Sequence, residues 1–210
     1  MSSSIRPTSE PMAVVWDFGN VLVRWEPQRA VIGRCTAAEW RDFRARARFD
    51  DLNRRADAGL SHEAGAAELE VIDPWLAEVY RHYTSHFADS LAGPIPGVAE
   101  LVNEVHAHGI PQFGLTNWAA EDFHHARHVP GFHLLQGVVV SGHEGVAKPD
   151  PRIFRILLDR YGLRPGGCVF VDDNADNVAT AHALGFRALR FEGAGPLRGA
   201  LEQLGLLPPS

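Results

Sequence analysis

Short runs of apolar residues alternate along this chain with longer segments that have helical periodicity. Five of the runs predict buried strands, because each is short and bounded by turn residues. They lie at 13–16, 110–115, 137–140, 168–171 and 186–191. Strands that alternate with helices are typical of a doubly wound, mainly parallel sheet. The predicted fold class is therefore α/β.

Three helical patterns between these strands end in the same way. They cover 98–108, 149–161 and 177–184, and a glycine follows each of them within one residue. Glycine readily adopts the left-handed conformation that ends helices, so it marks the helix boundaries. The helices therefore separate successive strands, as a doubly wound sheet requires.

The segment between the first two predicted strands is too long for a simple crossover. From about 27 to 93 it has helical periodicity and no convincing strand. Thr36-Ala37-Ala38-Glu39 is a capping-box pattern, and Asp73-Pro74 is an N-cap followed by proline at the first helical position. We predict a small helical cap at 27–93, inserted into a core of 11–26 and 94–210 and placed above the carboxyl edge of the sheet. The alternative is an enlarged crossover with no contact to a ligand.

Composition limits the partners and the location of the chain. Its 210 residues, 45% of them hydrophobic, suit one domain or one core with a modest insertion. The net charge of −6 comes with intermixed acids and bases, so we expect no nucleic-acid partner. Apolar runs fall short of the roughly 20 residues that cross a bilayer, and the polar start at 1–10 lacks the apolar core of a signal peptide. We expect a cytoplasmic protein without a membrane partner, either a monomer or a weak homodimer, with Cys35 and Cys168 as unpaired thiols.

The first predicted strand, at 13–16, runs directly into Asp17 and a Gly19-Asn20 turn. Burying a carboxylate is unfavourable unless a cation or hydrogen bonds compensate for the lost water. In open α/β sheets, moreover, ligands bind at the carboxyl ends of the strands. Asp17 is therefore a candidate catalytic residue; the alternative is that it only satisfies a turn.

Three further polar signals follow later elements. One strand ends in Thr116 and Asn117, Lys148 precedes a helix, and the strand at 168–171 ends in the pair Asp172-Asp173. Each alone is an ordinary helix cap or a solvated residue. Because parallel strands bring their carboxyl ends to one edge, their order and positions favour a common site with Asp17.

Together these residue types suit phosphoryl transfer. Asp17, a neighbouring backbone carbonyl and the Asp172-Asp173 pair offer the oxygen ligands that Mg²⁺ prefers, and the cation offsets the repulsion among the carboxylates. Asp17 can attack phosphorus and form an aspartyl-phosphate that water hydrolyses. Thr116, the backbone N–H of Asn117 and the Lys148 ammonium can hold the equatorial phosphate oxygens in the transition state.

The four segments, in this order, resemble the four motifs of the haloacid dehalogenase-like hydrolase superfamily. The insertion after the first strand resembles the small helical type-1 cap of that superfamily. The resemblance extends from about residue 12 to residue 191 and looks closest to the bacterial branch that includes a glucose-1-phosphate phosphatase. It implies a Mg²⁺-dependent phosphohydrolase acting on a small phosphorylated metabolite, such as a sugar phosphate or an acyl phosphate. Subfamily likeness does not transfer a substrate.

The resemblance also implies roles for individual residues. Asn20 and Trp118 are candidates to contact the substrate, although Trp118 can equally pack under the cap. The implied roles are the nucleophile for Asp17, Mg²⁺ ligation for the Gly19 carbonyl and Asp173, a metal-bound water on Asp172, and phosphate binding for Thr116 and Lys148.

Gly19 departs from the family pattern. Most phosphatases of the superfamily carry a second Asp two residues after the nucleophile, where it protonates the leaving group and then activates water. Gly19 cannot move a proton, and a positioned acid or base typically contributes about 10²–10⁴ in rate. Either the leaving group departs with little protonation, or a cap residue or water delivers the proton. Our hypothesis from the sequence is the first, with a rate that rises steeply as the leaving-group pKa falls.

Two other functions stay open from the sequence. A catalytically silent homologue would keep the phosphate cradle and lack turnover because of Gly19. The 2-haloacid dehalogenases of the superfamily use the same aspartate without a metal. At the positions that correspond to Asp172-Asp173 in this chain, they carry serines. That acidic pair would be pointless without a cation and would repel a carboxylate substrate.

Overall fold

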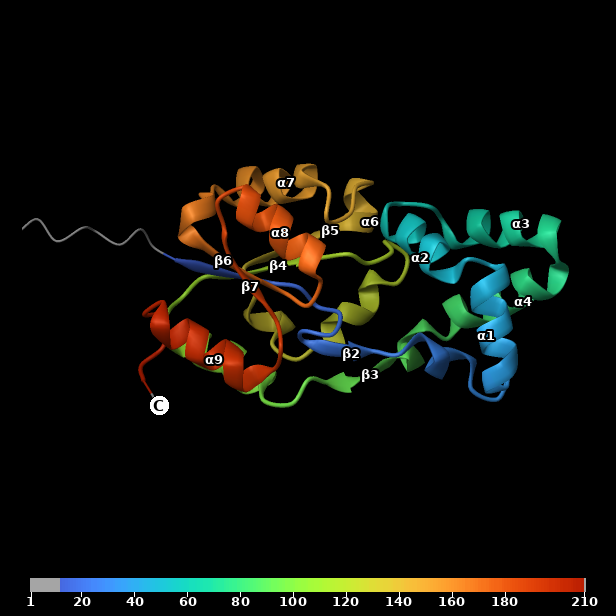
Figure 1. Ribbon diagram of the computed structural model, residues 1–210, viewed down its shortest axis with the longest axis horizontal. Helices are drawn as coiled ribbons and strands as arrows, with labels where there is room; N and C mark the ends of the chain where they lie inside the picture. The colour runs from blue at the N-terminus through green and yellow to red at the C-terminus, as the bar shows by residue number, and fades with distance from the viewer. Residues whose placement is uncertain (1–11, 210) are drawn as a thin grey trace, which may run out of the picture.

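The computed structural model describes residues 12–209, so the polar start at 1–10 lies outside the described residues. At its centre is a five-stranded parallel sheet with the strand order β5-β4-β1-β6-β7 (Figure 1). This sheet confirms the predicted α/β fold class. Its strands are β1 (Ala13–Trp16), β4 (Gln112–Thr116), β5 (Gly137–Val140), β6 (Cys168–Asp172) and β7 (Arg187–Arg190).

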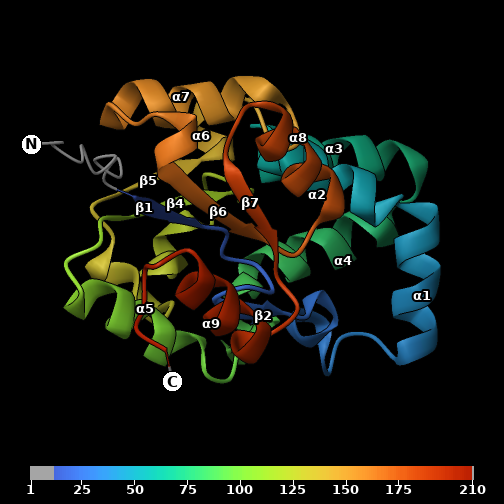
Figure 2. The same ribbon diagram turned by 60° about the vertical axis from the view of Figure 1, so that its left-hand side comes forward.

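Helices cover both faces of this sheet, as Figure 2 shows. Successive residues of β1 point to opposite faces, so Val15 packs into one apolar cluster while Val14 and Trp16 belong to the other. Burial on both faces explains why the central strands are continuously apolar. One face is covered by α7 (Pro151–Tyr161) and α8 (Ala175–Ala183), and the other by α5 (Val98–Ala107) and α9 (Ala194–Gln203).

Four helices between β1 and α5 gather to one side of the sheet (Figure 1). The capping box that opens the first of them is present, since the Thr36 side chain accepts from the Glu39 N–H and Glu39 returns the bond. Asp73 caps the last one by accepting from the Trp75 N–H. The elements are η1 (Pro27–Val31), α1 (Ala37–Arg46), α2 (Phe49–Asp57), α3 (His62–Ile72), α4 (Pro74–Ser85) and η2 (Phe87–Ser90).

The prediction that 27–93 contains no strand was wrong at its end. Strand β3 (Leu91–Pro94) pairs antiparallel with β2 (Val23–Trp25) and forms a two-stranded ribbon. Gly93 and Pro94 are poor strand formers, and the pairing comes from a distant part of the chain, so local sequence gave no signal. We propose that this ribbon marks the junction between the core, at 11–26 and 94–210, and the cap at 27–93.

Two helix starts differ from their predicted positions because polar caps set them. Helix α7 starts at Pro151, since Asp150 is its N-cap and accepts from the Arg152 N–H. Helix α8 starts before the predicted position because Asn174 caps it. Short elements complete the chain: η3 (Phe123–His128), η4 (Phe132–Leu134), α6 (Ser141–Glu144) and η5 (Pro165–Gly167).

Candidate active site

The carboxyl ends of two neighbouring strands, β1 and β6, bring the predicted acids together. Asp17 directly follows β1, Asp172 is the last residue of β6, and Asp173 comes next. One carboxylate oxygen from each lies within 4.8 Å of the others. Across residues 12–209, no other group of three or more His, Cys, Asp or Glu side chains has the spacing of a metal site. The convergence that the sequence predicted is therefore present in the fold.

Lys148 lies between two of these carboxylates and is only 3% exposed. Its Nζ is 2.8 Å from Asp17 Oδ1 and 2.7 Å from Asp172 Oδ2, and it also donates to the Leu115 carbonyl oxygen at 2.8 Å. An ammonium has three N–H groups, so these three contacts use all of them. Lys148 thus fixes the position of Asp17 and balances part of the acidic charge.

Asn117 holds the backbone of Lys148 in place. The Asn117 side-chain amide donates to the Lys148 carbonyl oxygen at 2.9 Å, and its Oδ1 accepts from the Lys148 N–H at 2.8 Å. From the sequence, only the backbone N–H of Asn117 is predicted to act. Its side-chain role was missed because the two residues are far apart in sequence and no local pattern links them.

Asp172 is completely buried, and hydrogen bonds engage both of its carboxylate oxygens. Oδ1 accepts from the Asn174 N–H at 2.8 Å, and the Asn177 amide nitrogen is 3.0 Å from each oxygen. Together with the Lys148 contact, these bonds leave little room for a direct ligand. Asp173 is only half-buried, so its carboxylate is the more available of the pair.

The Thr116 hydroxyl is buried and has no hydrogen-bond partner among the described residues. Leaving a buried hydroxyl unpaired costs on the order of 1–3 kcal/mol. Because Thr116 ends β4 beside β1, a phosphate oxygen at the strand ends would satisfy this hydroxyl. The unpaired group therefore supports the phosphate-binding role implied for Thr116.

The acidic cluster carries more negative charge than Lys148 alone can balance. Burial raises the pKa of Asp17 to about 7, and the charges of Asp172 and Asp173 add to this effect while Lys148 opposes it. Burial and the charge of Asp172 also raise the pKa of Asp173. An oxygen-rich, electron-rich set of donors fits a hard divalent cation such as Mg²⁺, which would favour the ionised carboxylates.

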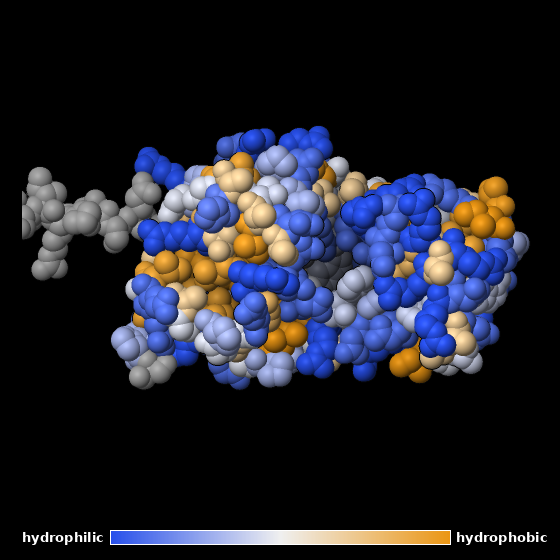
Figure 3. Space-filling view, viewed as in Figure 1, coloured by the Kyte–Doolittle hydropathy of each residue, from blue (hydrophilic) through white to orange (hydrophobic). Residues whose placement is uncertain are grey.

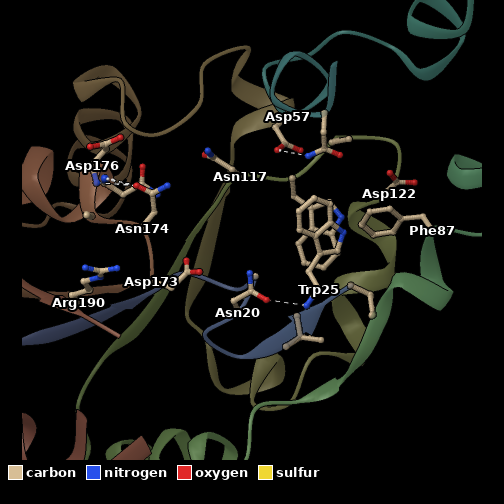
Figure 4. Close-up of a pocket in the computed structure, with 18 residues that line it drawn as sticks. Asn20, Trp25, Asp57, Phe87, Asn117, Asp122, Asp173, Asn174, Asp176 and Arg190 are labelled. Carbon is tan, nitrogen blue, oxygen red and sulfur yellow. Dashed lines mark hydrogen bonds between the residues drawn. The ribbon is translucent and has the colours of Figure 1, made fainter. Parts of the chain in front are cut away.

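A pocket of about 580 Å³ opens over this cluster, between the sheet and the cap helices (Figure 3). Asp57 lies across the pocket from Asn20 in Figure 4. Asp17 is 7% exposed and does not line the pocket itself, but Asp173, with which it shares the acidic cluster, does. Trp118 both lines the pocket and packs against Phe87, with ring centroids 5.7 Å apart. Five residues singled out from the sequence line the pocket: Gly19, Asn20, Asn117, Trp118 and Asp173.

Gly19 has room for a side chain. A Cβ placed there would have no heavy atom within 4 Å, apart from its chain neighbours, and its backbone is not in the left-handed region. The glycine is therefore not forced by sterics or by backbone conformation. The structure therefore has open space at the position where the resemblance to the haloacid dehalogenase-like superfamily leads us to expect an acid.

Three cap and loop residues that the sequence analysis did not identify also shape this pocket. Asp57, the last residue of α2, accepts a hydrogen bond from the Asn53 amide at 3.1 Å. Asp122, 5% exposed, lines the same wall, and its carboxylate is 2.8 Å from Nε2 of His62 at the start of α3. The His62 N–H also donates to Glu121 at 2.8 Å. His62 therefore links the cap to the loop that follows β4.

Replacing His62 with alanine is expected to lower the free energy of unfolding by about 1–3 kcal/mol near pH 6, because Asp122 then stays buried without its partner. Burial alone would lower the pKa of His62, but the hydrogen bond to Asp122 and the charges of Asp122 and Glu121 outweigh it, so this pKa is raised above 6.5. A histidine whose pKa is raised by folding stabilises the folded protein. The stabilisation is complete when the pH is below the pKa in the unfolded chain, and it disappears as the pH rises through the pKa in the folded protein.

Urea unfolding of the wild type and His62→Ala at about pH 6 and about pH 9 checks this prediction. We expect the difference between the two proteins to shrink at the higher pH. His106→Ala, at an exposed position of α5, is the control and should match the wild type at both. An equal loss at both pH values would contradict the charged His62–Asp122 pair.

Comparison with known proteins places this site in a family. The family model for haloacid dehalogenase-like hydrolases matches residues 11–185, which is most of the chain. The chain belongs to this family and is a hydrolase, which confirms the resemblance seen in the sequence. Sesquiterpene phosphatase astK from Aspergillus oryzae is 27% identical over 188 residues, covering 85% of this chain and 89% of that relative.

Solved structures show the same fold at low sequence identity. A HAD-like family hydrolase from Porphyromonas gingivalis has a TM-score of 0.70 and 21% identity, covering 92% of this chain and 97% of its own. A HAD family enzyme from Bacteroides thetaiotaomicron, in complex with magnesium and inorganic phosphate, has a TM-score of 0.63 and 16% identity. The match covers 87% of this chain and 94% of that one. Dehalogenases also share this fold, so the fold alone does not select the reaction.

Other curated relatives match over shorter segments. This chain spans between 10% and 31% of the length of five of them, including a phosphoserine phosphatase from Thermus thermophilus. These segments support the family and leave the activity of the whole protein as a proposal. Separately, none of the helices within residues 12–209 combines the length and the apolar character that crossing a membrane requires.

Proposed function

We propose that this hydrolase is a Mg²⁺-dependent phosphatase of small phosphorylated metabolites that works through an aspartyl-phosphate on Asp17. The observation that carries the proposal is the geometry around this carboxylate. Asp17 ends a buried strand, contacts Lys148 at 2.8 Å and lies within 4.8 Å of Asp172 and Asp173. A nucleophilic carboxylate beside a fixed cation and further acids suits phosphoryl transfer.

In the first step, an oxygen of Asp17 forms a bond to phosphorus, and the bond from phosphorus to the ester oxygen breaks. The Thr116 hydroxyl and the Asn117 N–H hold the phosphate oxygens, and the Lys148 ammonium, whose three N–H groups are engaged, offsets the charge that the transition state spreads over these oxygens. In the second step water attacks phosphorus and the Asp17 carboxylate is released. Asn117 contributes twice, because its side chain also fixes the backbone of Lys148.

Four groups would hold the cation: Asp17, the Gly19 carbonyl, Asp173, and Asp172 through a bound water. This assignment fits the hydrogen bonds, since Asp172 has both oxygens engaged and Asp173 opens into the pocket. When bound, Mg²⁺ supplies positive charge that offsets the carboxylates and the incoming phosphate. Among the charged side chains that line the pocket within the described residues, Asp57, Asp122, Asp173 and Asp176 are acids and Arg190 is the one cation.

The walls of the pocket favour a leaving group without a second negative charge. Its cap side combines the acids Asp57 and Asp122 with the apolar side chains of Trp25 and Phe87. A carboxylate on the substrate would face these acids, while Arg190, the one cation of the lining, is on the other side of the pocket in Figure 4, which argues against 2-haloacids. Neutral alcohols such as sugars suit this wall, and Asn20 and Trp118 are placed to contact them.

Chelation is expected to remove the activity. Phosphate release from p-nitrophenyl phosphate should fall at least roughly tenfold with EDTA and return when Mg²⁺ is added in excess, because Asp17 then loses the charge that offsets its neighbours. Circular dichroism in EDTA serves as the control for folding. A folded protein that binds Mg²⁺ but releases no phosphate from acyl, sugar and aryl phosphates would instead support the catalytically silent homologue. Equal activity with and without metal would contradict the proposal.

A further inference from the structure

The phosphatase reaction needs a proton donor, and Gly19 cannot supply it. Four acids line the pocket: Asp57, Asp122, Asp173 and Asp176. Asp173 belongs to the acidic cluster, and Asp122 is engaged by His62 at 2.8 Å. Asp176 is an exposed residue in the first turn of α8. Among these four acids, this leaves Asp57 as the candidate proton donor.

The end of α2 holds Asp57 against the core. A Cβ at Gly59 would lie only 3.6 Å from the Gly145 Cα, so the backbone that follows the helix closely approaches the core. The Asn53 amide donates to Asp57 Oδ2 at 3.1 Å, and Ala119, three residues after Thr116, lines the same pocket. The fold thus places a cap carboxylate above the loop that carries the phosphate-binding groups (Figure 4).

We propose that Asp57 is the general acid and base of this enzyme, and that it supplies from the cap the proton transfer that Gly19 cannot perform. This inference rests on the phosphatase function proposed above. Asp57 lies outside the four motifs that resemble those of the superfamily. The cap would therefore supply a catalytic residue in addition to covering the pocket.

The surroundings of Asp57 keep it able to exchange a proton near neutral pH. Burial and the charge of Asp122 raise its pKa to about 7, against the charges of Lys148 and His62 and the backbone of Ala119, which lower it. A pKa near the working pH makes both the acid and the base form available. Lys148, one of the charges that act on Asp57, itself contacts Asp17 at 2.8 Å.

The proton balance of the reaction is complete with this residue. As Asp17 bonds to phosphorus, the ester oxygen leaves with the electron pair of the broken bond and takes the proton from Asp57. In the second step the Asp57 carboxylate takes a proton from water as the water oxygen attacks phosphorus. The electron pair of the phosphorus–Asp17 bond returns to Asp17, so phosphate leaves and both residues regain their starting states.

Proton transfer from Asp57 and the hypothesis drawn from the sequence, in which the leaving group departs with little protonation, make opposite predictions. If Asp57 protonates the leaving oxygen, kcat/KM of the wild type depends weakly on the leaving-group pKa. If no residue protonates it, the dependence is steep. A series of aryl and alkyl phosphates measured with the wild type and Asp57→Asn separates the two, since kcat/KM reports the first step alone.

We expect Asp57→Asn to lose about 10²–10⁴-fold in kcat/KM for alkyl phosphates and much less for p-nitrophenyl phosphate. With p-nitrophenyl phosphate it should also show a burst of nitrophenolate equal to the enzyme concentration, because the second step then lacks its base. Asp50→Asn is the matched control. It makes the same change on the same helix, at an exposed position that pairs with Arg44, and should behave as the wild type.

Gly19→Asp in the Asp57→Asn background provides a rescue, because the space at Gly19 accepts a side chain. We expect it to restore the weak dependence on leaving-group pKa. Equal slopes for the wild type and Asp57→Asn, without a burst, would overturn the role of Asp57 while leaving the phosphatase function intact. Absence of any metal-dependent turnover in the wild type would instead overturn the proposed function itself.

Discussion

The Asp17→Asn variant is expected to lose at least about 10⁴-fold in kcat on any phosphate ester, because an amide cannot form the phosphoryl bond. The loss should be the same for good and poor leaving groups. It should also be insensitive to added Mg²⁺, since the missing group is the nucleophile and not only a ligand. Phosphate release measured over hours against a no-enzyme blank checks the residual rate.

The same variant should remain folded. Burial raises the pKa of Asp17 from 3.8 to about 7. At pH values between these two, Asp17 keeps its proton in the native protein and has lost it in the unfolded chain. Ionising Asp17 therefore opposes folding as pH rises, and a neutral amide removes that penalty. We expect an unfolding temperature at neutral pH no lower than that of the wild type. A folded variant that keeps most of its activity would contradict the nucleophile assignment.

Replacing Lys148 with methionine is expected to destabilise the protein by about 3–5 kcal/mol, the usual loss when one partner of a buried ion pair is removed. Asp17 and Asp172 would then share a buried site without the ammonium that contacts both, at 2.8 Å and 2.7 Å. Activity should fall as well, by about 10²–10³-fold, because the transition state loses the positive charge that offsets its phosphate oxygens and Asp17 loses the contact that positions it.

The loss in the Lys148→Met variant should grow with pH. Lys148 lowers the pKa of Asp17, so its removal raises this pKa further, and the ionised carboxylate opposes folding more strongly as pH increases. Denaturant unfolding at about pH 5 and about pH 8, both in EDTA, measures this trend. Arg152→Met, an exposed cation on α7, is the control. Equal stability of the Lys148→Met variant and the wild type would contradict the buried pairing.

The part of the site that lies on the sheet could be predicted because buried strands and their ends are recognisable in the pattern of apolar and polar residues. Continuous apolar runs that stop at Asp17, Thr116 and Asp172 identify buried parallel strands, and parallel strands share one carboxyl edge. Lys148 could be placed with them only through the order of the motifs. What the sequence lacked was the hydrogen-bond network, since the Asn117 side chain pairs with a residue far along the chain.

The cap half of the site could not be predicted in the same way. Asp57 stands in the segment Asp50-Asp51-Leu52-Asn53-Arg54-Arg55-Ala56-Asp57, where acids and arginines alternate as on any solvated helix. Asp50 and Asp57 have the same local character, yet one is exposed and the other faces the pocket. Only the docking of α2 against the core distinguishes them. His62 likewise gains its partner Asp122 through tertiary contact.

In the proposed reaction the phosphoryl group is transferred to Asp17 before water releases it. Rapid acid quenching of the wild-type enzyme during the first turnover of p-nitrophenyl phosphate with Mg²⁺, followed by peptide mass mapping, detects this intermediate. We expect a phosphoryl group on the peptide that contains Asp17, which forms and decays at the rate of turnover and is absent with EDTA. Phosphate release over the same interval without this phosphopeptide, or with the phosphoryl group on another residue, would contradict the transfer to Asp17.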